Sequence, residues 1–488
     1  MLSLLIFLPF LAALASLIFR QEDVSKWLSL AVAALTSLLS LGLWLGYDLA
    51  QGGFQYVQDI PWLSTLGINL NLAADGLSLP FLFLSALLTL IAILSEWQRK
   101  DGAIFSLFML LEAALMGVFA SLDLIIFFIA FELALIPMFF IIGVWGYDNR
   151  RYASLKFLLY SLVGSVFLLI GILSLGFLAG DGGVSFDYRQ LLLTAPLIAK
   201  TPALLICLAL SIAFLIKLPS VPFHTWLPHA HTQAPTGGSI MLAGLLLKMG
   251  GYGLIRFNVS LFPEAMQTLQ PFFALLAVLS LLYGGMVALG QSDLKQLIAY
   301  SSVNHMGFVL LGIASLTAFG LHGAVYQMVA HGVITGLLFL LIGMLSHRTH
   351  TRSIAALKGM YTAMPILGGL MWLAMLGGAG IPGMAGFIGE FQAILGAFQN
   401  PSTSLWAVLG AFGILVNAAL MLWTIQRVLQ GEPSEQMKAN YDLHDITSLE
   451  LLSALPLILL ALIWGFLPQS LSPYIDVGVQ SALSQLGF

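Results

Sequence analysis

Charge is scarce in this sequence. Only 8% of its 488 residues are Asp, Glu, Lys or Arg, whereas about 25% of the residues of a soluble domain are charged. The formal net charge is only −4, so the chain lacks the basic excess of a nucleic-acid-binding protein. The single cysteine, Cys207, lies inside an apolar run, which excludes an intrachain disulfide and a thiolate metal cluster.

Hydrophobic residues are abundant instead, at 59% of the chain. They form long apolar runs, and a run of about 18 residues is enough to span a bilayer. We therefore predict an all-α polytopic membrane protein with about fourteen transmembrane helices. Their predicted limits are 2–19, 27–47, 76–95, 103–120, 122–143, 154–179, 203–217 with a broken extension, 238–257, 270–290, 296–315, 320–346, 362–398, 404–429 and 446–468. We expect the intervening segment 48–75 to lie on the membrane surface, because it carries few charges.

The basic residues between the predicted helices are distributed unevenly. Thirteen follow odd-numbered helices: Arg20, Lys26, Arg99, Lys100, Arg150, Arg151, Lys156, Lys295, Arg348, Arg352, Lys358, Arg427 and Lys438. Three follow even-numbered helices: Arg189, Lys200 and Arg256. Loops rich in Lys and Arg face the cytoplasm. We therefore predict that the odd-numbered loops are cytoplasmic and that both termini lie on the opposite side.

Eight ionisable residues fall inside predicted helices: Lys217, Lys248, Glu112, Glu132, Glu390, His305, His322 and His331. A charge at the bilayer centre costs about 2.5–3.5 kcal/mol, so these groups need partners or water. Two interpretations stay open: static ion pairs that fix helix packing, or a hydrated path for protons or cations. Their number and chemistry favour the path, because a desolvated lysine releases its proton readily and histidine titrates near neutral pH.

Helix breakers stand beside two of these charges. One segment, "AFLIKLPSVPFHTWLPHAHTQAPTGG", contains Lys217, and another, "LGGAGIPGMAGFIGEF", contains Glu390. A break frees backbone carbonyls, which a membrane tolerates only inside protein or beside a water-filled cavity, and discontinuous helices mark the ion sites of many transporters. The breakers are Pro219 and Pro222 in the first segment and Pro382 and Gly383 in the second.

The two broken helices are five helices apart in the predicted order. That spacing predicts two inverted repeats of five helices, each with one broken helix, because an odd number of helices reverses the second copy. The repeats cover 103–257 and 270–429. Three helices within 1–102 precede them, and a final helix at 446–468 follows.

Other motif-like features predict no metal or cofactor in the chain. His224, His229 and His231 lie close together but have no nearby acid or cysteine, which argues against a metal site. "GAGIPG" follows no strand and lies in a predicted helix, so it is not a dinucleotide-binding loop. A haem bound between histidines such as His322 and His331 is a further alternative. These two lie nine positions apart on one predicted helix, so they cannot both be ligands of the same haem.

The chain resembles the antiporter-like membrane subunits of complex I. The resemblance rests on "FFIAFELALIPMFFIIGVWG", "KLPSVPFHTWLPHAHTQAPTGGSIMLAGLLLKMGGYGLIR", "DLKQLIAYSSVNHMGFVLLG", "QMVAHGVITGLLFLLIGML" and "GIPGMAGFIGEF". It implies a fold of fourteen helices with two inverted repeats. With Glu390, the chain resembles the subunit M type, because the other types usually have lysine at this position. Subunit M is also called chain 4 and has counterparts in cyanobacteria and chloroplasts.

The resemblance also implies roles for individual residues. Glu132 and Lys217 would form a coupling ion pair, and Glu390 would carry protons at the exit side. Lys248, His305 and His331 would form the relay between them. Further candidates are Glu112, His224 and His231. The chain departs from the family at His229 and Gln233, where acids are usual or frequent.

The implied function is proton translocation in the membrane arm of a complex-I-type NAD(P)H or ferredoxin:quinone oxidoreductase. Flavin, iron–sulfur and quinone sites are then expected in partner subunits, which would include homologous antiporter-like subunits, with lipids around them and no nucleic acid. The expected location is a bacterial plasma membrane or a cyanobacterial or chloroplast thylakoid membrane. A Mrp-type cation/proton antiporter subunit, or a cyanobacterial variant for cyclic electron flow or CO₂ uptake, stays an alternative.

Overall fold

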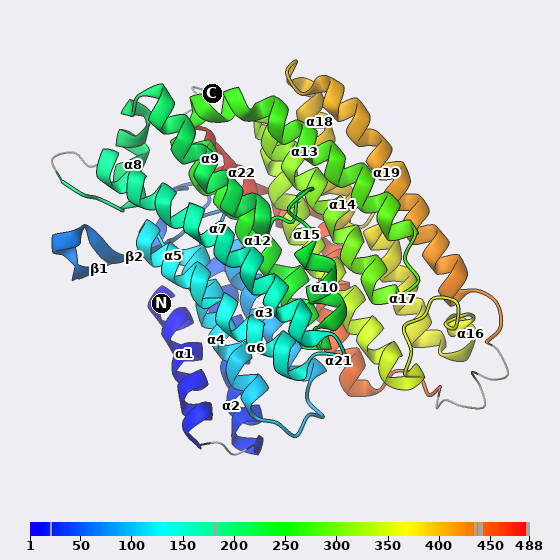
Figure 1. Ribbon diagram of the computed structural model, residues 1–488. Coiled ribbons are helices and arrows are strands. Elements are labelled where there is room, and N and C mark those ends of the chain that lie inside the picture. The colour runs from blue at the N-terminus through cyan, green and yellow to red at the C-terminus, as the bar shows by residue number, and fades with distance from the viewer. Residues whose placement is uncertain (20–21, 180–182, 434–436, 438–442, 485–488) are drawn as a thin grey trace.

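The protein is a nearly all-helical bundle (Figure 1). The computed structural model describes all residues except 20–21, 180–182, 434–436, 438–442 and 485–488. Two residues used to predict the orientation, Arg20 and Lys438, lie outside the described residues.

The first half of the chain contains seven predicted spans and the start of the eighth. Its elements are α1 (Leu2–Phe19), α2 (Glu22–Leu45), β1 (Gln55–Leu63), β2 (Ile68–Ala74), α3 (Leu79–Ser95), α4 (Ala103–Ala120), α5 (Leu124–Leu133), α6 (Leu135–Trp145), α7 (Arg150–Leu178), α8 (Tyr188–Thr194), α9 (Lys200–Lys217), α10 (Trp226–Gln233), α11 (Thr236–Met241) and the π-helical η3 (Leu242–Leu246).

The second half continues the same pattern. Its elements are α12 (Leu247–Gly253), the π-helical η4 (Leu254–Val259), α13 (Pro263–Leu289), α14 (Leu294–Ser315), α15 (Ala318–Thr349), α16 (Met360–Ala363), α17 (Pro365–Gly378), α18 (Ala385–Gln399), α19 (Ser404–Thr424), the π-helical η5 (Ile425–Leu429), α21 (Ser448–Phe466) and α22 (Ser472–Leu483).

The predicted spans are confirmed as helices. Within the described residues, 11 helices are long and apolar enough to cross a membrane, and three shorter apolar helices, α1, α3 and α17, complete the predicted order. The two predicted breaks are also present, between α9 and α10 and between α17 and α18. The limits of the inverted repeats stay a prediction.

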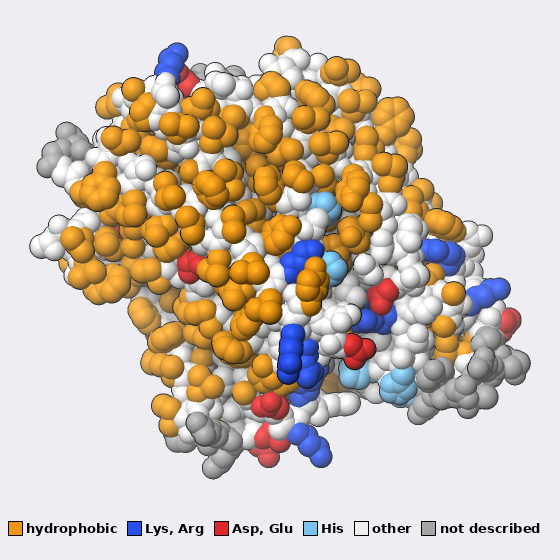
Figure 2. Space-filling model, in the orientation of Figure 1, with side chains coloured by type: hydrophobic (Ala, Val, Ile, Leu, Met, Phe, Trp, Pro, Cys, Tyr) orange, Lys and Arg blue, Asp and Glu red, His pale blue; other side chains and the backbone are white. Residues whose placement is uncertain are grey.

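Hydrophobic side chains cover most of the face drawn in Figure 2, and charged side chains gather mainly toward its lower end. Such a broad apolar surface is unfavourable in water and favourable in a lipid bilayer. The innermost elements are the run from α11 to η4 and α15, whose apolar windows are 100% buried. The chain is therefore an integral membrane protein with a protein-lined centre.

The segment 48–75 differs from the all-helical expectation. It contains an antiparallel hairpin of β1 and β2, with Gly67 in the left-handed region at φ 73°. The hairpin is fixed to the bundle because the N–H of Asn69 donates to Asp123 Oδ2 (3.0 Å). The same aspartate caps α5 by accepting from the N–H of Ile125. The C-terminal helix α22 was likewise not predicted, because its apolar run is short.

Glycine brings α15 and α18 into unusually close contact. A Cβ added at Gly323 would lie 2.4 Å from the backbone nitrogen of Ala393, and one at Gly389 would lie 2.6 Å from Cα of Gln327. Small residues at a helix interface let two membrane helices approach this closely. The close contact places polar side chains of α15 directly against those of α18.

Candidate proton-transfer site

The first break places Lys217 at the end of α9 inside the protein. Its side chain is only 1% exposed. Prolines at 219 and 222 prevent the helix from continuing, since they have no N–H to donate. The freed carbonyls find other partners: Trp226 Nε1 donates to the carbonyl of Ile216 (2.9 Å), and Ser220 Oγ donates to that of Leu215 (3.2 Å). The break is therefore a satisfied and well-packed structure.

The Lys217 amine lies between aromatic rings. Its Nζ is 5.1 Å from the ring centre of Phe131 and 5.3 Å from that of Phe157, distances at which a cation is attracted to the ring face. It also donates a hydrogen bond to Ser161 Oγ (3.4 Å). The amine thus has two aromatic faces and one hydroxyl around it.

Glu132 lies near the end of α5, next to a kink. The kink at Ala134 separates α5 from α6, and Pro137 explains it because its ring clashes with the carbonyl of Leu133. The carboxylate accepts a short hydrogen bond from Ser165 Oγ. Glu132 is partly exposed on the surface of the isolated chain, unlike the fully buried Lys217.

Glu132 and Lys217 are not in direct contact, although their opposite charges interact, and their role as a coupling pair stays a prediction. No salt bridge within 4 Å joins the two described side chains. Two serines one turn apart on α7 connect them instead: Ser165 binds the carboxylate, and Ser161 binds the amine. The hydroxyl of Ser165 also lies 2.9 Å from the carbonyl of Ser161. The kink and the break hold the two charges on either side of this serine pair.

The second lysine, Lys248, follows the π-helical turn η3 and is 0% exposed. Single π-helical turns inside α-helices occur frequently at functional sites. The Lys248 amine makes a short hydrogen bond to the carbonyl of Ala243 and lies 2.7 Å from Nδ1 of His331. Gly250 lets the α12 backbone approach α9, since a Cβ there would lie 2.5 Å from the carbonyl of Phe214.

A chain of polar groups runs from His331 to Glu390. The rings of His331 and His305 are 5.3 Å apart between centroids, in an edge-to-face arrangement. His305 Nδ1 lies 3.0 Å from Glu390 Oε1. Gln327 Nε2 donates to the same carboxylate oxygen (3.2 Å), and Asn417 Nδ2 reaches it at 3.5 Å. Four helices, α14, α15, α18 and α19, therefore converge on Glu390.

The second break provides room for Glu390. Gly380 and Gly383 both adopt left-handed backbone conformations, at φ 69° and 95°, which glycine adopts without strain. A Cβ at Gly380 would lie 2.6 Å from Glu390 Oε2. The freed carbonyl of Gly378 accepts a hydrogen bond from Asn417 Nδ2 (2.7 Å). The break thus brings glycine backbone against the carboxylate.

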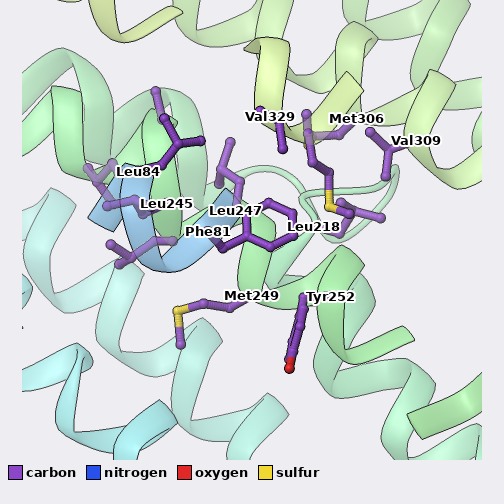
Figure 3. Close-up of a cluster of buried hydrophobic side chains, with 14 of the residues drawn as sticks. Phe81, Leu84, Leu218, Leu245, Leu247, Met249, Tyr252, Met306, Val309 and Val329 are labelled. Carbon is purple, nitrogen blue, oxygen red and sulfur yellow. The ribbon is translucent and has the colours of Figure 1, made fainter. Parts of the chain in front are cut away.

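Apolar side chains surround this polar chain. Figure 3 shows Leu218 among side chains of α14 and α15, with Leu247 and Met249 nearby on α12. Leu218 and Leu247 are 0% exposed. The clustered residues are sequence neighbours of the lysines and histidines described above, so the polar groups lie in a low-dielectric environment where their mutual interactions are strong.

Comparison with known proteins now identifies the family. A family model described as "NADH:quinone oxidoreductase/Mrp antiporter, TM" matches residues 121–416, which include both breaks and Lys248, His305, His331 and Glu390. The chain belongs to this family.

Relatives within the family cover nearly the whole chain. NADH-quinone oxidoreductase subunit M of Rickettsia prowazekii is 39% identical over 99% of this chain and 98% of its own length. NAD(P)H-quinone oxidoreductase chain 4 2 of Thermosynechococcus vestitus is 38% identical over 98% of this chain and 90% of its own length. The predicted resemblance to the subunit M or chain 4 type is confirmed.

Solved structures agree with these relatives. A chain of respiratory complex I from Thermus thermophilus superposes with a TM-score of 0.91 and 32% identity, covering 100% of both chains. A chain of the Mrp complex from Dietzia sp. shares the fold, with a TM-score of 0.87 and 20% identity over 98% of this chain and 96% of its own length. The oxidoreductase branch is therefore the nearer one, and the Mrp alternative is disfavoured.

Three further candidates are not hydrogen-bonded to the polar chain, although His231 lies within electrostatic range of Lys248 and His331. Glu112 on α4 accepts from Thr36 Oγ1 of α2 (2.5 Å), and its Oε2 has no hydrogen-bond partner. His231 stacks on Phe339 with 4.7 Å between ring centroids. His224 packs edge-on against a tyrosine ring. Among the described contacts, no hydrogen bond joins these three side chains to Lys217, Lys248 or Glu390.

The positions that depart from the family pattern contact the loop between α6 and α7 and the start of α7. Gln233 Oε1 accepts from the N–H of Asn149 (3.0 Å). His229 is exposed and lies edge-on against Tyr152, 5.3 Å between ring centroids. Neither contact needs an acid. His224, His229 and His231 form no metal site by geometry, since no group of three potential ligands occurs among the described residues.

Sequence reasoning missed several polar groups of the site. Gln327 and Asn417 bind Glu390 from two different helices, and only their position within apolar runs could have drawn attention to them. Lys295 was assigned to a loop but is 4% exposed, in the first turn of α14. Its amine donates to the carbonyl of Ala234 (2.5 Å). Its place directly before a predicted span gave no signal of this burial.

A buried ion pair was missed as well. Arg256 binds Asp75 Oδ1 at 2.6 Å, with both side chains under 5% exposed. The guanidinium lies 5.2–5.5 Å from the ring centres of Phe54, Tyr188 and Tyr252. This cluster ties η4 to the start of α3 and is separate from the proton-transfer site.

Proposed function

We propose that this chain is a proton-translocating membrane subunit of a complex-I-type NAD(P)H or ferredoxin:quinone oxidoreductase. The continuous buried chain of Lys248, His331, His305 and Glu390 supports this function most directly. Groups of this kind in a membrane interior are typical of proton pathways. The close relatives are named as quinone oxidoreductase subunits.

Electron transfer takes place in partner subunits in this proposal, where the flavin, iron–sulfur and quinone sites lie. This chain carries no redox centre and receives energy as a rearrangement of charges. Glu132 is suited to receive it, since it is only partly buried in the isolated chain. One elementary charge moved against 100 mV costs about 2.3 kcal/mol, and a change in one buried charge contact is of that size or larger.

The serine pair transmits that change to Lys217. When a charge outside the chain draws Glu132 away, Ser165 loses its carboxylate partner and the favourable field at the amine weakens. An amine in an apolar pocket that loses a nearby negative charge releases its proton more readily. The proton then moves toward the centre of the chain, along the broken helix.

The central relay moves the proton in three steps. The protonated Lys248 amine donates to His331 Nδ1, 2.7 Å away. The proton then passes from His331 to His305, whose rings contact each other edge to face at 5.3 Å between centroids. His305 Nδ1 then donates to Glu390 Oε1 (3.0 Å), which becomes neutral. Each group regains its starting charge when it binds the next proton or passes its own proton on.

The uneven distribution of Lys and Arg supports a cytoplasmic location for the odd-numbered loops and a non-cytoplasmic one for both termini. The location in this proposal is a bacterial plasma membrane or a cyanobacterial or chloroplast thylakoid membrane. The partners are homologous antiporter-like subunits and other membrane-arm subunits, together with lipids. The solved neighbours are themselves chains of multi-subunit complexes.

The variant Glu390→Gln tests the proposal. The whole complex is purified with this substitution, reconstituted into liposomes, and assayed for protons moved per electron. We expect an assembled complex with strongly reduced proton translocation, because glutamine keeps the volume and the hydrogen bonds but cannot carry a proton. Glu264→Gln is the matched control, since that carboxylate is 74% exposed and pairs only with a surface lysine. Wild-type translocation by Glu390→Gln, or proton flux that requires Na⁺, would contradict the proposal.

A further inference from the structure

His322 is a buried histidine that the relay described above does not use. It lies on the first turns of α15, and its side chain is 6% exposed. Its Nδ1 lies 2.5 Å from Oε1 of Gln392 on α18. Its Nε2 lies 3.5 Å from Oδ1 of Asp476 on α22, whose side chain is 58% exposed. The ring of Tyr326 stacks on it at 5.9 Å. The imidazole thus joins the buried α15–α18 interface to an exposed carboxylate.

The position of His322 continues the direction of the relay. Along α15, His331 contacts Lys248, Gln327 contacts Glu390, and His322 comes next. At 1.5 Å per residue, His322 lies about 7.5 Å beyond Gln327 along the helix axis. The helix begins at Ala318, so this end of α15 is near the surface.

Contacts between α15 and α18 show that the two helices run in opposite directions here. Glu390 binds Gln327, and Gln392 binds His322 one to two turns further on. Still nearer the surface, the carbonyl of Gly396 accepts from Thr317 Oγ1 (3.2 Å). Polar side chains therefore form successive contacts from Glu390 to the end of the bundle.

We propose that His322 is the group through which protons leave Glu390, and that Asp476 passes them to the aqueous phase. Both ring nitrogens face acceptor oxygens, so this placement fits the protonated ring: Nδ1–H donates to Gln392 Oε1, and Nε2 faces Asp476 Oδ1. The Nε2 proton leaves to Asp476 and to the outside, and the neutral ring keeps its Nδ1 proton. The ring then turns so that its bare nitrogen accepts, through water, the next proton that leaves Glu390, and turning back restores the starting placement.

The ring is chemically suited to this step, because an imidazole can bind a proton on each of two separate nitrogens. One nitrogen faces α18, which carries Glu390, and the other faces the exposed carboxylate. The alternative is a purely structural contact that holds α22 against α15. A structural contact requires a side chain of suitable shape, whereas an exit group requires one that can be protonated.

This exit role rests on the proposed function, and two variants of His322 test it in the reconstituted complex. His322→Gln keeps a side chain that can bind both Gln392 and Asp476 but cannot be protonated. His322→Ala removes the ring and leaves space beside the exposed Asp476, which soluble imidazole can enter. His347→Gln is the matched control, since His347 is exposed at the opposite end of the same helix.

We expect His322→Gln and His322→Ala to slow proton translocation on the order of 100-fold, as removal of a positioned acid–base group does. Imidazole added on the side of α22 should restore translocation in His322→Ala but not in Glu390→Gln, and His347→Gln should behave as wild type. Wild-type translocation by assembled His322→Gln would overturn the exit role. The exit role would also be overturned if His322→Ala slowed translocation, His322→Gln translocated at the wild-type rate, and added imidazole did not rescue His322→Ala. If Glu390→Gln also translocates normally, the proposed function itself fails.

Discussion

Replacing Gly380 by alanine should disturb Glu390 without removing any ionisable group. Gly380 has φ 69°, a conformation that costs a residue with a Cβ about 1–3 kcal/mol. The added Cβ would also lie 2.6 Å from Glu390 Oε2. An ordinary contact needs about 3.5 Å between such atoms, so the carboxylate or the backbone must move by about 0.9 Å.

A movement of that size is enough to break the hydrogen bond to His305. The bond is 3.0 Å long, and a contact beyond about 3.6 Å no longer counts as one. A hydrogen bond to a charged group contributes about 1.5–3 kcal/mol, which corresponds to a change of roughly 10- to 150-fold in the transfer equilibrium. We therefore expect Gly380→Ala to lower proton translocation substantially in a complex that still assembles.

The assay compares Gly380→Ala with Gly369→Ala, another glycine on the same broken span. A Cβ at Gly369 would meet only the ring of Tyr361, at an ordinary 3.9 Å, so this control should translocate protons as wild type does. Both complexes are quantified for assembly and then assayed for protons per electron. If Gly380→Ala assembles fully and matches the control in translocation, the close contact between Gly380 and Glu390 has no functional role.

Three further substitutions give different expected results. Glu132→Gln should assemble but lower the proton-to-electron ratio, because the uncharged amide cannot transmit a charge change, and an unchanged ratio in liposomes would refute that role. Glu112→Gln should leave the ratio unchanged, since Glu112 contacts Thr36 and not the relay; a loss of translocation would show a connection that the structure does not contain. Arg256→Met should destabilise the folded complex by about 3–5 kcal/mol, because it leaves the carboxylate of Asp75 buried without its partner, and an unchanged thermal unfolding curve would contradict this.

The sequence predicted the helices and the two breaks well, because the physics of both is local. An apolar run of bilayer length has few alternatives to a membrane helix, and the prolines after Lys217 cannot continue one. Buried Lys and Glu residues were likewise conspicuous in apolar runs, since each needs compensation in a membrane.

Residue partners that are distant in the chain could not be predicted in the same way. Ser161 and Ser165 are ordinary small residues of an apolar helix, and only the fold places them between Glu132 and Lys217. Arg256 and Asp75 are 181 positions apart. The lack of direct contact between Glu132 and Lys217 could not be predicted either, because only the fold shows that the kink after α5 and the end of α9 hold the two charges on either side of the serines.

Short elements were missed for a related reason. The hairpin was missed although β2 alternates apolar and polar residues, because β1 does not alternate and contains Pro61. The hairpin is fixed to the bundle through Asp123. The helix α22 is only 12 residues long, too short to be recognised as a span. Its Asp476 nevertheless meets His322, so the missed helix carries one of the groups on which the exit depends.

The central claim is that buried lysines release protons in each cycle, and Lys217→Arg tests it most directly. Arginine keeps the positive charge and adds hydrogen-bond donors, but a guanidinium does not deprotonate in proteins. Translocation by the assembled Lys217→Arg complex is compared with that of Lys217→Ala, and the same pair is made at Lys248. We predict that arginine performs as poorly as alanine at both positions. An assembled Lys217→Arg complex that translocates protons at the wild-type rate would contradict the account and leave Lys217 with a static, structural charge.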